Sequence, residues 1–511
     1  MPIQIVNRQI AFSGGYDEHP ADRRNRKHRD RRTRKQRSTA SQRPICPSRA
    51  QSFDTARFPA CNGGIRCCTR RGSVPASLAA GGGGGGGGKG TVTRYPLQIP
   101  PTVVSPSNYI LNAAPGTADL GGGKFSSVLA YNSLFPGPTF QANKSDSASI
   151  SFTNGLSEAT TIHWHGMIAP TNADGQPQDL VAPGGGKSYQ FPIIQRACLN
   201  WYHPHPHMAT GKQVVLGLAG AFIVNDAEEA ALGLPSGAHE LPLIVRDANF
   251  DRAGNLIYNP TSSGYLAKNP MVNGTRDPYL NVDTALYRFR VLNGASARLF
   301  KIALNNGAPF TLIGNDGGLL ETAVQVSQIE FSPGERLDLL VDFRGLSVGT
   351  KVMLQDLNAG WNLLEFNVTQ GVTDNYAIPT TLSTITKLSN PVTTRSFSFD
   401  GMTRINGKEY DLNRIDFQVP FSQTELWRFT TNGNAPHPVH IHGASFQVQS
   451  RTGGRGVLFP WERGWKDTVL LNDRETVEVL IRFDGYRGRY LIHCHKLEHE
   501  DQGMMSNFVV S

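Results

Sequence analysis

The residues most able to do chemistry lie near the end of the chain, at residues 493–505, with the sequence HCHKLEHEDQGMM. In extended backbone, neighbouring side chains point to opposite faces, and residues two apart share a face. Cys494 is therefore expected to face one way, while His493 and His495 face the other. A thiolate in this position can bind a metal ion on its own side, and the two imidazoles can bind metal ions on the far side.

Three further residues complete a candidate site around the thiolate of Cys494. His499 and Met504 follow it closely in the chain, and His437 is the candidate for a second histidine. One Cys, two His and a long, weak axial Met are the ligand set of blue-copper electron-transfer sites. The sequence thus predicts a site of this kind.

Histidines also occur in three earlier motifs: HWHG at residues 163–166, WYHPH at residues 201–205 and HPVHIHG at residues 437–443. A lone His-x-His pair is weak evidence, because most such pairs are surface or packed histidines. Four pairs together with a cysteine form a specific signal. The pairs supply eight imidazoles, namely those of His163, His165, His203, His205, His440, His442, His493 and His495.

These motifs, in this order, resemble those of the multicopper oxidases, the family of laccases, bilirubin oxidases and bacterial copper-efflux oxidases. The resemblance covers residues 92–511. It implies four copper ions, namely one type 1 ion, one type 2 ion and a type 3 pair. By correspondence of motifs, His163 and His440 bind the type 2 ion. The type 1 ligands are then Cys494, His437, His499 and Met504, and the type 3 ligands are His165, His203, His205, His442, His493 and His495.

The resemblance also implies an activity and the acids that support it. A reducing substrate gives up single electrons at the type 1 centre, and these pass along Cys494 to the neighbouring histidines, where O2 is reduced to water. This reduction consumes protons, which we expect carboxylates near the cluster to supply. Asp174, nine residues after His165, and Glu500, next to His499, match acidic residues of the family. The alternative for each acid is a solvated or hydrogen-bonded surface carboxylate.

From residue 91 onward the chain consists of short β-branched and aromatic runs separated by Gly, Pro and Asn turns. No long stretch has the 3.6-residue period of a helix, so the pattern predicts an all-β, Greek-key sandwich architecture. Together with the resemblance, it predicts three cupredoxin-like domains at residues 91–232, 238–370 and 391–511. A linker is expected at residues 371–390.

The candidate ligands are divided unevenly among these domains. The first and third contain all the His-x-His pairs, so the trinuclear cluster is expected at the interface between them. The second contains only His239, near its start. We therefore expect the second domain to space and dock its neighbours.

Residues 1–90 are expected to form a disordered basic leader. They contain 18 Lys and Arg and 5 Asp and Glu residues, so they carry a net charge of +13. The whole chain carries +9, which leaves −4 for the globular part and nothing that suggests a nucleic-acid surface. The basic run at residues 23–37 could alone bind polyanions, but a solvated, disordered segment is the favoured interpretation. The leader ends in eight consecutive glycines at residues 81–88, which disfavour a fixed conformation.

Residues 69–80, with the sequence TRRGSVPASLAA, resemble a degenerate twin-arginine export signal, which many bacterial members of the family carry. Pro75 interrupts the segment, glycines replace the expected apolar core, and the two arginines lie far from Met1. These departures leave open a defective signal or a true start further downstream. The prediction is a periplasmic or secreted protein. No run of 18 or more apolar residues occurs, so no membrane-spanning helix is expected.

Cysteine usage predicts no disulfide framework in the globular part. Four of the six cysteines lie in the leader, and Cys494 is assigned to metal. Cys198 is left without a partner and is expected to be a small buried residue.

Four other residues beside the motifs receive supporting roles. His207 exceeds the ligand count and is expected to hold a ligand or a backbone carbonyl. Trp164 and Trp201 are expected to pack beside the ligands and exclude water. Met505 is assigned to the core.

Within the family, the predicted reaction is a laccase-type oxidation of phenols, aromatic amines or bilirubin-like pigments. The partners are O2 and a small reducing substrate, and the enzyme is expected to be a monomer. One alternative is oxidation of Cu(I), but copper-efflux oxidases carry a methionine-rich insert, whereas residues 378–390 contain no Met. The other is a non-catalytic envelope protein that has lost its coppers, but here Cys494 and ten histidines of the motifs are all present. Charge alone does not select the substrate.

Overall fold

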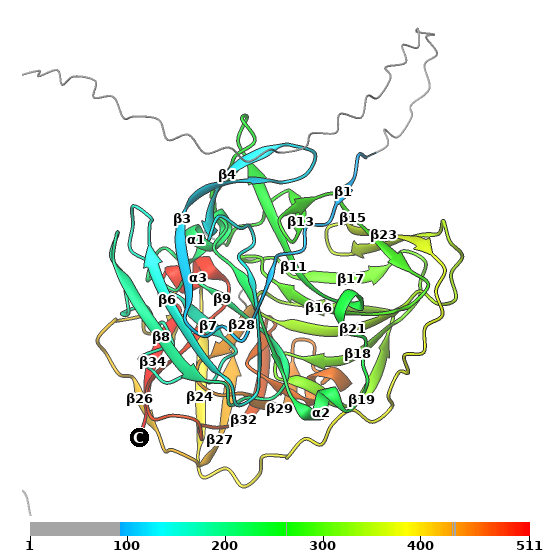
Figure 1. The fold of residues 1–511 in the computed structure, drawn as a ribbon. Helices are drawn as coiled ribbons and strands as arrows, with labels where there is room; N and C mark the ends of the chain where they lie inside the picture. Colours follow the sequence, from blue (N-terminus) through cyan, green and yellow to red (C-terminus); the bar gives the residue numbers. More distant parts are fainter. Residues whose placement is uncertain (1–91, 262, 432, 434–435) are drawn as a thin grey trace, which may run out of the picture. The chain divides into compact units, whose positions relative to one another are not determined.

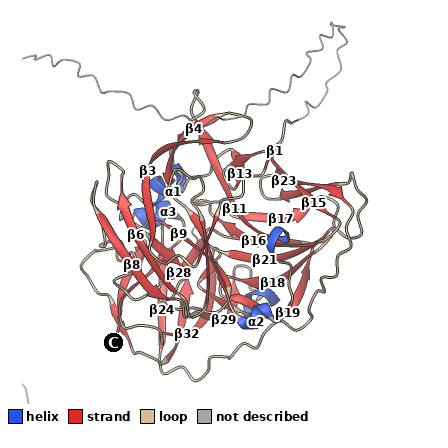
Figure 2. Ribbon diagram, in the orientation of Figure 1, coloured by secondary structure: helices blue, strands red, loops and turns tan. Residues whose placement is uncertain are grey.

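The computed structural model describes residues 92–261, 263–431, 433 and 436–511. The predicted leader at residues 1–90 and its export motif lie outside these residues. Strands dominate the described part, and its helices are short (Figure 2). The strands form six sheets that pair into three sandwiches, which confirms the predicted all-β fold with three cupredoxin-like domains. The boundaries of the three domains stay predictions.

The first sandwich joins a four-stranded and a five-stranded sheet over one hydrophobic core. Along β6, alternate residues are buried, because one face of the strand packs on this core and the other meets solvent. Strands β3, β6 and β8 lie side by side in Figure 1. The four-stranded sheet has the order β4 (Phe125–Tyr131), β3 (Tyr109–Asp119), β6 (Ser147–Asn154) and β8 (Gly186–Pro192). The five-stranded sheet has the order β2 (Thr102–Val104), β5 (Thr139–Asn143), β10 (Gly220–Asn225), β9 (Cys198–His203) and β7 (His163–His165).

The second sandwich contains the largest hydrophobic core. Its central strand β16 (Leu286–Asn293) is buried at every position, as expected for a strand covered on both faces. One sheet has the order β1 (Tyr95–Pro96), β15 (Pro278–Asp283), β23 (Trp361–Gln370), β22 (Lys351–Asp356), β17 (Phe300–Leu304) and β20 (Gln328–Phe331). The other has the order β14 (Thr275–Arg276), β13 (Asn269–Val272), β11 (Glu240–Phe250), β16, β21 (Arg336–Asp342), β18 (Phe310–Asn315) and β19 (Gly318–Val326), with β12 (Leu256–Ile257) paired to β11.

The third sandwich carries the C-terminal motif on a central strand. Its core includes Cys494 and Met504 among large aromatic residues. One sheet has the order β25 (Arg404–Ile405), β24 (Thr394–Asp400), β27 (Thr424–Thr430), β32 (Glu475–Arg482), β29 (Phe446–Gly453) and β30 (Trp465–Lys466). The other has the order β26 (Phe417–Val419), β34 (Met505–Val510), β33 (Gly488–Cys494), β28 (His437–Ile441) and β31 (Thr468–Leu471).

Direct contacts join the three sandwiches. Trp201 of β9 in the first packs in an apolar cluster with Ile244 and Leu292 of the second. Asp501, at the end of α3, accepts hydrogen bonds from the backbone N–H groups of Thr210 and Gly211 in α1, both at 2.8 Å. These two helices lie side by side in Figure 1 and connect the first and third sandwiches. The helices are α1 (Thr210–Leu216), α2 (Ala227–Ala230) and α3 (Leu497–Asp501), with 3-10 turns η1 (Gly237–His239) and η2 (Pro460–Arg463).

Residues 371–390, predicted to be a linker, contain no strand or helix. They are nevertheless held in place, because Leu382, Ile385 and Leu388 are buried. The N–H of Leu382 donates to Glu321 O in the second sandwich, and that of Leu388 donates to Gln447 Oε1 in the third. The segment therefore packs along both sandwiches that it connects.

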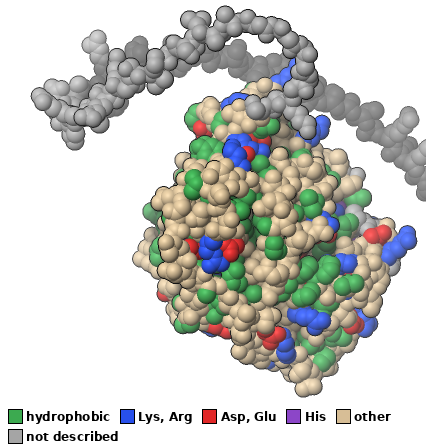
Figure 3. Space-filling model, turned by 90° about the vertical axis from the view of Figure 1, so that its right-hand side faces the viewer, with side chains coloured by type: hydrophobic (Ala, Val, Ile, Leu, Met, Phe, Trp, Pro, Cys, Tyr) green, Lys and Arg blue, Asp and Glu red, His purple; other side chains and the backbone are tan. Residues whose placement is uncertain are grey.

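Charged side chains are scattered among polar and apolar ones on the face shown in Figure 3. Among the described residues, no helix is long and apolar enough to cross a membrane.

Candidate metal centres

The eight histidines of the His-x-His pairs meet where the first and third sandwiches face each other. Each is at most 2 % exposed. Strand pairing explains the convergence, because β7 aligns His163 with His203 and β28 aligns His440 with His493. Across the interface, the ring of His163 stacks on that of His442 with centroids 3.8 Å apart.

Backbone carbonyls fix the tautomer of several of these rings. The Nδ1 atoms of His163, His440 and His203 lie 2.8–2.9 Å from carbonyl oxygens. A carbonyl oxygen can only accept, so each Nδ1 carries the proton and each Nε2 presents a lone pair. Burial is the main cause that lowers the pKa of His203 to about 3 and that of His440 to about 4, so both imidazoles are neutral near pH 7.

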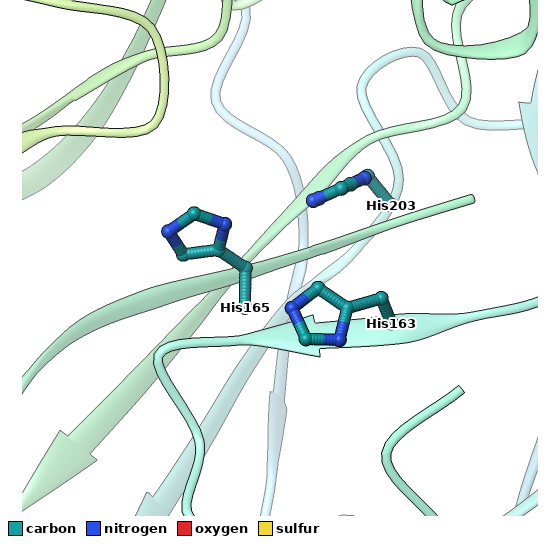
Figure 4. A group of neighbouring side chains, drawn as sticks. All are labelled: His163, His165 and His203. Atoms are coloured by element: carbon teal, nitrogen blue, oxygen red, sulfur yellow. The ribbon is translucent and has the colours of Figure 1, made fainter. Parts of the chain in front are cut away.

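The lone pairs converge in small groups. The Nε2 atom of His493 lies 3.4 Å from Nε2 of His205 and 3.2 Å from Nε2 of His442. A second group in the cluster consists of His163, His165 and His203. These three offer ligand atoms within 4.8 Å of one another, and their rings surround a common space in Figure 4. The ring of His495 lies 4.8 Å from that of His165, which adds a further imidazole.

Within the part of the chain that the structure describes, several of these nitrogens have no hydrogen-bond partner, although buried polar atoms normally have one. Converging imidazole lone pairs without donors are what a transition metal requires, and imidazole is a ligand suited to copper. The residues present therefore fit a group of copper ions. The unpartnered atoms are His163 Nε2, His165 Nδ1, His203 Nε2, His205 Nδ1, His440 Nε2 and both ring nitrogens of His495.

A second group of ligand atoms surrounds the sulfur of Cys494. Its Sγ lies 3.4 Å from Nδ1 of His437 and 3.6 Å from Nδ1 of His499, and these two nitrogens are 3.3 Å apart. Burial raises the pKa of Cys494 to about 12 and lowers that of His437 to about 3. A thiol in such surroundings ionises only when a cation is bound beside it, so this donor set also fits copper.

Met504 is completely buried beside this group. Its carbonyl oxygen accepts from the N–H of Cys494 at 3.1 Å, and its N–H donates to the carbonyl oxygen of His499 at 2.9 Å. Met505, the neighbouring methionine, belongs to β34 and pairs with His493. The backbone of Met504, and not that of Met505, thus bonds both Cys494 and His499. Its role as an axial ligand stays a prediction.

The two predicted acids both contact the histidine cluster. Oδ2 of Asp174 lies 2.8 Å from Nδ1 of His442, while the carbonyl oxygen of Asp174 accepts from His163. Burial raises the pKa of Asp174 well above its ordinary value, and the charge of Asp179 adds to the effect. The carboxylate oxygens of Glu500 lie 3.2 Å from Nδ1 of His205 and 3.3 Å from Nδ1 of His493. Neither acid is a solvated surface carboxylate, since both are at most 1 % exposed.

Three residues that the sequence analysis did not single out also reach the cluster. Asp467 Oδ1 lies 3.1 Å from Nε2 of His165, and the hydroxyl of Thr468 lies 3.2 Å from the same nitrogen. Arg336 of the second sandwich donates to both carboxylate oxygens of Asp467. Burial alone would raise the pKa of Asp467, but the Arg336 guanidinium holds it well below its usual range. None of the three belongs to a recognisable motif, so only the folded structure reveals them.

The remaining predictions concern residues around the cluster. Cys198 is buried, as expected, and Asn200 Nδ2 lies 3.2 Å from its sulfur. Trp164 and Trp201 are fully buried, and the Trp201 ring lies 4.1 Å from that of His203. His207 contacts the ring of Tyr410, and its Nδ1 has no partner among the described residues, so its predicted hold on a ligand or carbonyl stays a prediction.

A cavity of about 480 Å³ lies at the junction of the three sandwiches. Gly166 and Ala444 line both this cavity and a narrow gap beside His163, His440 and His442. A space that small molecules can enter therefore lies next to the cluster.

Similarity to known proteins agrees with this geometry. Residues 112–229 and 377–511 match sequence profiles described as multicopper oxidase. The chain is 33 % identical over 414 residues to multicopper oxidase mco of Staphylococcus haemolyticus, over 79 % of this chain and 88 % of that protein. It is also 33 % identical over 461 residues to bilirubin oxidase of Albifimbria verrucaria, over 81 % and 80 % of the two chains. The crystal structure of McoA multicopper oxidase from Aquifex aeolicus matches with a TM-score of 0.77 at 35 % identity, over 82 % of this chain and 100 % of that one.

The chain therefore belongs to the multicopper oxidase family, whose members are copper-dependent oxidoreductases that use O2. Two further similarities show the range of activities around it. A multicopper oxidase from Campylobacter jejuni, described as a metallo-oxidase, matches with a TM-score of 0.72 at 28 % identity, over 82 % of this chain and 96 % of that one. Cell division protein FtsP of Escherichia coli is 30 % identical over 413 residues, over 76 % of this chain and 86 % of that protein.

Proposed function

We propose that the protein is a laccase-type oxidase that takes single electrons from phenols or aromatic amines and reduces O2 to water. The observation that carries this proposal is the complete ligand set, with Cys494, His437 and His499 on one side of β33 and eight buried imidazoles on the other. Bound copper ions supply the redox chemistry that no side chain of the cluster has by itself. The named similarities to a bilirubin oxidase and to multicopper oxidases support the same class.

The positions of the ligand atoms support a set of four copper ions. His163 and His440 would hold the type 2 ion through their free Nε2 atoms. His205, His442 and His493 would hold one type 3 ion, and His165, His203 and His495 the other. Cys494, His437, His499 and Met504 would hold the type 1 ion.

Cys494 joins the two groups of ligands by covalent bonds alone. Its side chain faces His437 and His499, while its backbone continues directly into His493 and His495. Few bonds therefore separate the site of substrate oxidation from the site of O2 reduction. The carbonyl oxygen of Cys494 also accepts from Nδ1 of His493 at 3.1 Å, which adds a second connection.

Asp174 and Glu500 would deliver the protons that O2 reduction consumes. Each contacts two of the candidate ligand histidines on the ring atom that faces away from the cluster. In these positions the acids would orient the imidazoles and hold protons beside the cluster. The cavity that reaches Gly166 offers a route for O2 and water.

The proposed function is tested by oxygen uptake of the copper-loaded protein with a phenol, an aromatic diamine, bilirubin and Cu(I). The expected result is turnover of the organic substrates with four substrate electrons consumed per O2 and no release of peroxide. Cys494→Ser is the matched control, because it removes one ligand atom and leaves the fold. Turnover with Cu(I) alone would assign the protein to the cuprous oxidases. A fully loaded protein without any oxygen uptake would instead make it a non-catalytic member.

The predicted export of the protein is a separate part of the proposal. It is supported by the twin-arginine-like residues 69–80, and it places the enzyme in the periplasm or outside the cell. Fusing residues 1–91 to a reporter that functions only after export tests it. A reporter that stays inactive, while the same fusion with an established signal is active, would contradict it.

A further inference from the structure

Arg336 is a completely buried arginine whose five N–H donors all have acceptors. Nε donates to Leu199 O at 3.0 Å, Nη1 to Gly334 O at 2.8 Å and to Asp467 Oδ1 at 2.7 Å. Nη2 donates to Asp316 O at 3.2 Å and to Asp467 Oδ2. A guanidinium has five such donors in a fixed planar fork, so the site uses all of them.

The acceptors of Arg336 come from all three sandwiches. Leu199 belongs to β9 of the first, Gly334 and Asp316 to the second, and Asp467 to the third. Arg336 itself starts β21 of the second sandwich. One side chain thus ties the domain that contributes no candidate ligand to the two domains that do.

Asp467, which is bound by Arg336, also contacts two histidines of the cluster. Its Oδ1 atom accepts from Nε2 of His165 at 3.1 Å, and its carbonyl oxygen accepts from Nδ1 of His440 at 2.9 Å. The hydroxyl of Thr468 lies 3.2 Å from both of these ring nitrogens. The two rings stack with their centroids 3.7 Å apart and their planes within 9°.

The carboxylate decides which nitrogen of His165 is free. Because a carboxylate only accepts, Nε2 of His165 must carry the proton, and the lone pair of Nδ1 is left for a metal ion. The tautomer is therefore opposite to that of His163, His203 and His440, which free Nε2. Among the described residues, Arg336 is the only Lys or Arg in ion-pair contact with Asp467. Neighbouring Lys466 is instead paired with Asp316 and Glu335, at 2.8 and 3.1 Å.

The turn before Arg336 is seated directly against the cluster. A Cβ atom at Gly334, which has φ +83°, would lie 3.1 Å from Cε1 of His165 and 3.1 Å from Cγ of His495. No side chain fits there without moving a ring. The second sandwich thus touches the cluster both through this turn and through the Arg336–Asp467 pair.

We propose that Arg336 is a positioning residue of the histidine cluster, which holds Asp467 so that His165 and His440 present the correct nitrogens. This inference rests on the proposed function, because it assumes that these histidines bind copper. It assigns the second sandwich a part in the metal centre beyond that of a spacer. Loss of the pair would leave the Cys494 site intact, since Arg336 contacts none of its residues.

The test is Arg336→Lys in the full chain, compared with Arg290→Lys. Lysine keeps the charge but has three donors and no planar fork. Asp467 therefore loses one of its two hydrogen bonds from residue 336, and the backbone carbonyl groups that accept from Arg336 lose their hydrogen bonds. Arg290 is also a buried arginine of the second sandwich, but among the described residues it pairs with Glu229, Glu240 and Asp338 and not with Asp467. Both proteins are loaded with copper, and copper content, the paramagnetic resonance spectrum of type 2 copper, the blue absorption band and the melting temperature are measured.

Arg336→Lys is expected to weaken type 2 copper binding by about 10- to 100-fold and to change its resonance spectrum, while the blue band is kept. Arg290→Lys is expected to lower the melting temperature and leave both copper signals unchanged. If both variants lose type 2 copper equally, or if Arg336→Lys keeps an unchanged spectrum, Arg336 has only a structural role. Wild-type protein that binds no copper would contradict the proposed function itself, which is a different result.

Asp467→Asn is the second variant, in case Arg336→Lys does not fold. The amide keeps the shape but can present an N–H to Nε2 of His165, which favours the wrong tautomer. The expected result is loss of the copper ion that His165, as a type 3 ligand, would hold, measured as a lower copper content with a retained blue band. An unchanged copper content in this variant would overturn the inference.

Discussion

The two candidate metal centres differ in how the chain builds them. The group around Cys494 comes entirely from the third sandwich, from residues 437–504, and it lies inside that sandwich's own core. The histidine cluster takes half its rings from the first sandwich and half from the third, and it is supported from the second by Arg336. One site therefore needs only a folded domain, whereas the other needs three docked domains.

The largest effect is expected from a substitution in β33, the strand that both centres share. Cys494→Ser should abolish the blue colour and reduce oxidase activity to background, because a hydroxyl cannot replace the soft thiolate. The histidine cluster should keep its copper, since Cys494 contributes no side-chain atom to it. Copper content and absorption spectra check both statements. A strong blue band that survives the substitution would remove Cys494 from the site, and loss of all copper would show that the two centres are not independent.

A smaller effect is expected from Asp174→Asn, which acts on the cluster alone. The amide keeps the shape of the carboxyl but cannot transfer protons, so O2 reduction should slow by about 100-fold or more. Reduction of the blue site by substrate should be unchanged. Stopped-flow measurement of the two half-reactions decides the matter, with Asp119→Asn, an acid away from both centres, as the control. Equal slowing of both half-reactions would show that Asp174 does not act on the cluster alone.

Acid should destabilise the metal-free protein mainly through the cluster, because burial lowers the pKa of seven of its histidines and of two beside Cys494. Burial lowers the folded-state pKa of His203 to about 3, below its value of about 6.5 in an unfolded chain. The contribution of this histidine to stability is therefore full above about pH 6.5 and is lost as the pH falls towards 3. Each such residue adds about 1.4 kcal/mol per pH unit to the slope.

Replacing His203 with Gln should reduce the slope of unfolding free energy against pH by about 1.4 kcal/mol per pH unit, which corresponds to one proton. The measurement is the free energy of unfolding of metal-free protein between pH 6.5 and pH 4. Equal slopes for wild type and His203→Gln would mean that this histidine is not buried as a neutral ring.

A finer difference is expected inside the Cys494 site. Met504→Leu should raise the reduction potential of the blue site, because a thioether gives a little electron density to oxidised copper and Leu gives none. The two side chains have similar volumes, so packing should change little. Redox titration of the blue band measures the shift. Met505→Leu is the matched control, and a shift in the control with none for Met504 would exchange their roles.

Deleting residues 1–90 should have the smallest effect, with copper content and activity unchanged in both centres. Every candidate ligand lies after residue 91. A longer deletion, of residues 1–104, also removes β1 and β2, which pair with β15 and β5, and should lower the melting temperature. A failure of the shorter variant to load copper would show that the leader takes part in folding.

Residues that belong to local motifs could be predicted from the sequence, whereas residues that depend on domain docking could not. Cys494 and its neighbours were predictable because alternation along one strand needs no knowledge of the fold, and the His-x-His pairs follow the same rule. Asp174 and Glu500 followed from their spacing to motifs of the family, and both contact the cluster.

Arg336 and Asp467 were not predictable, because their role depends on a contact between residues 131 positions apart. An isolated Asp or Arg carries no periodic or motif signal, and its burial depends on how the sandwiches dock. The candidate ligands of the cluster were therefore visible in the sequence, whereas the groups that contact two of them were not. Met504 lies between these cases, since its backbone bonds place it beside the site while its role as a ligand stays a prediction.

Both metal centres require the correct register between β28 and β33, so copper can bind only to a correctly paired chain. His440 is aligned with His493, and Val439 with Cys494, so both centres depend on a single strand register. A slip of one residue would turn every side chain of β33 to the opposite face. Cys494 would then point into the imidazoles, and His493 and His495 would point into the core of the third sandwich. A chain with this error would lose both centres together, so the metal would stabilise only correctly paired molecules.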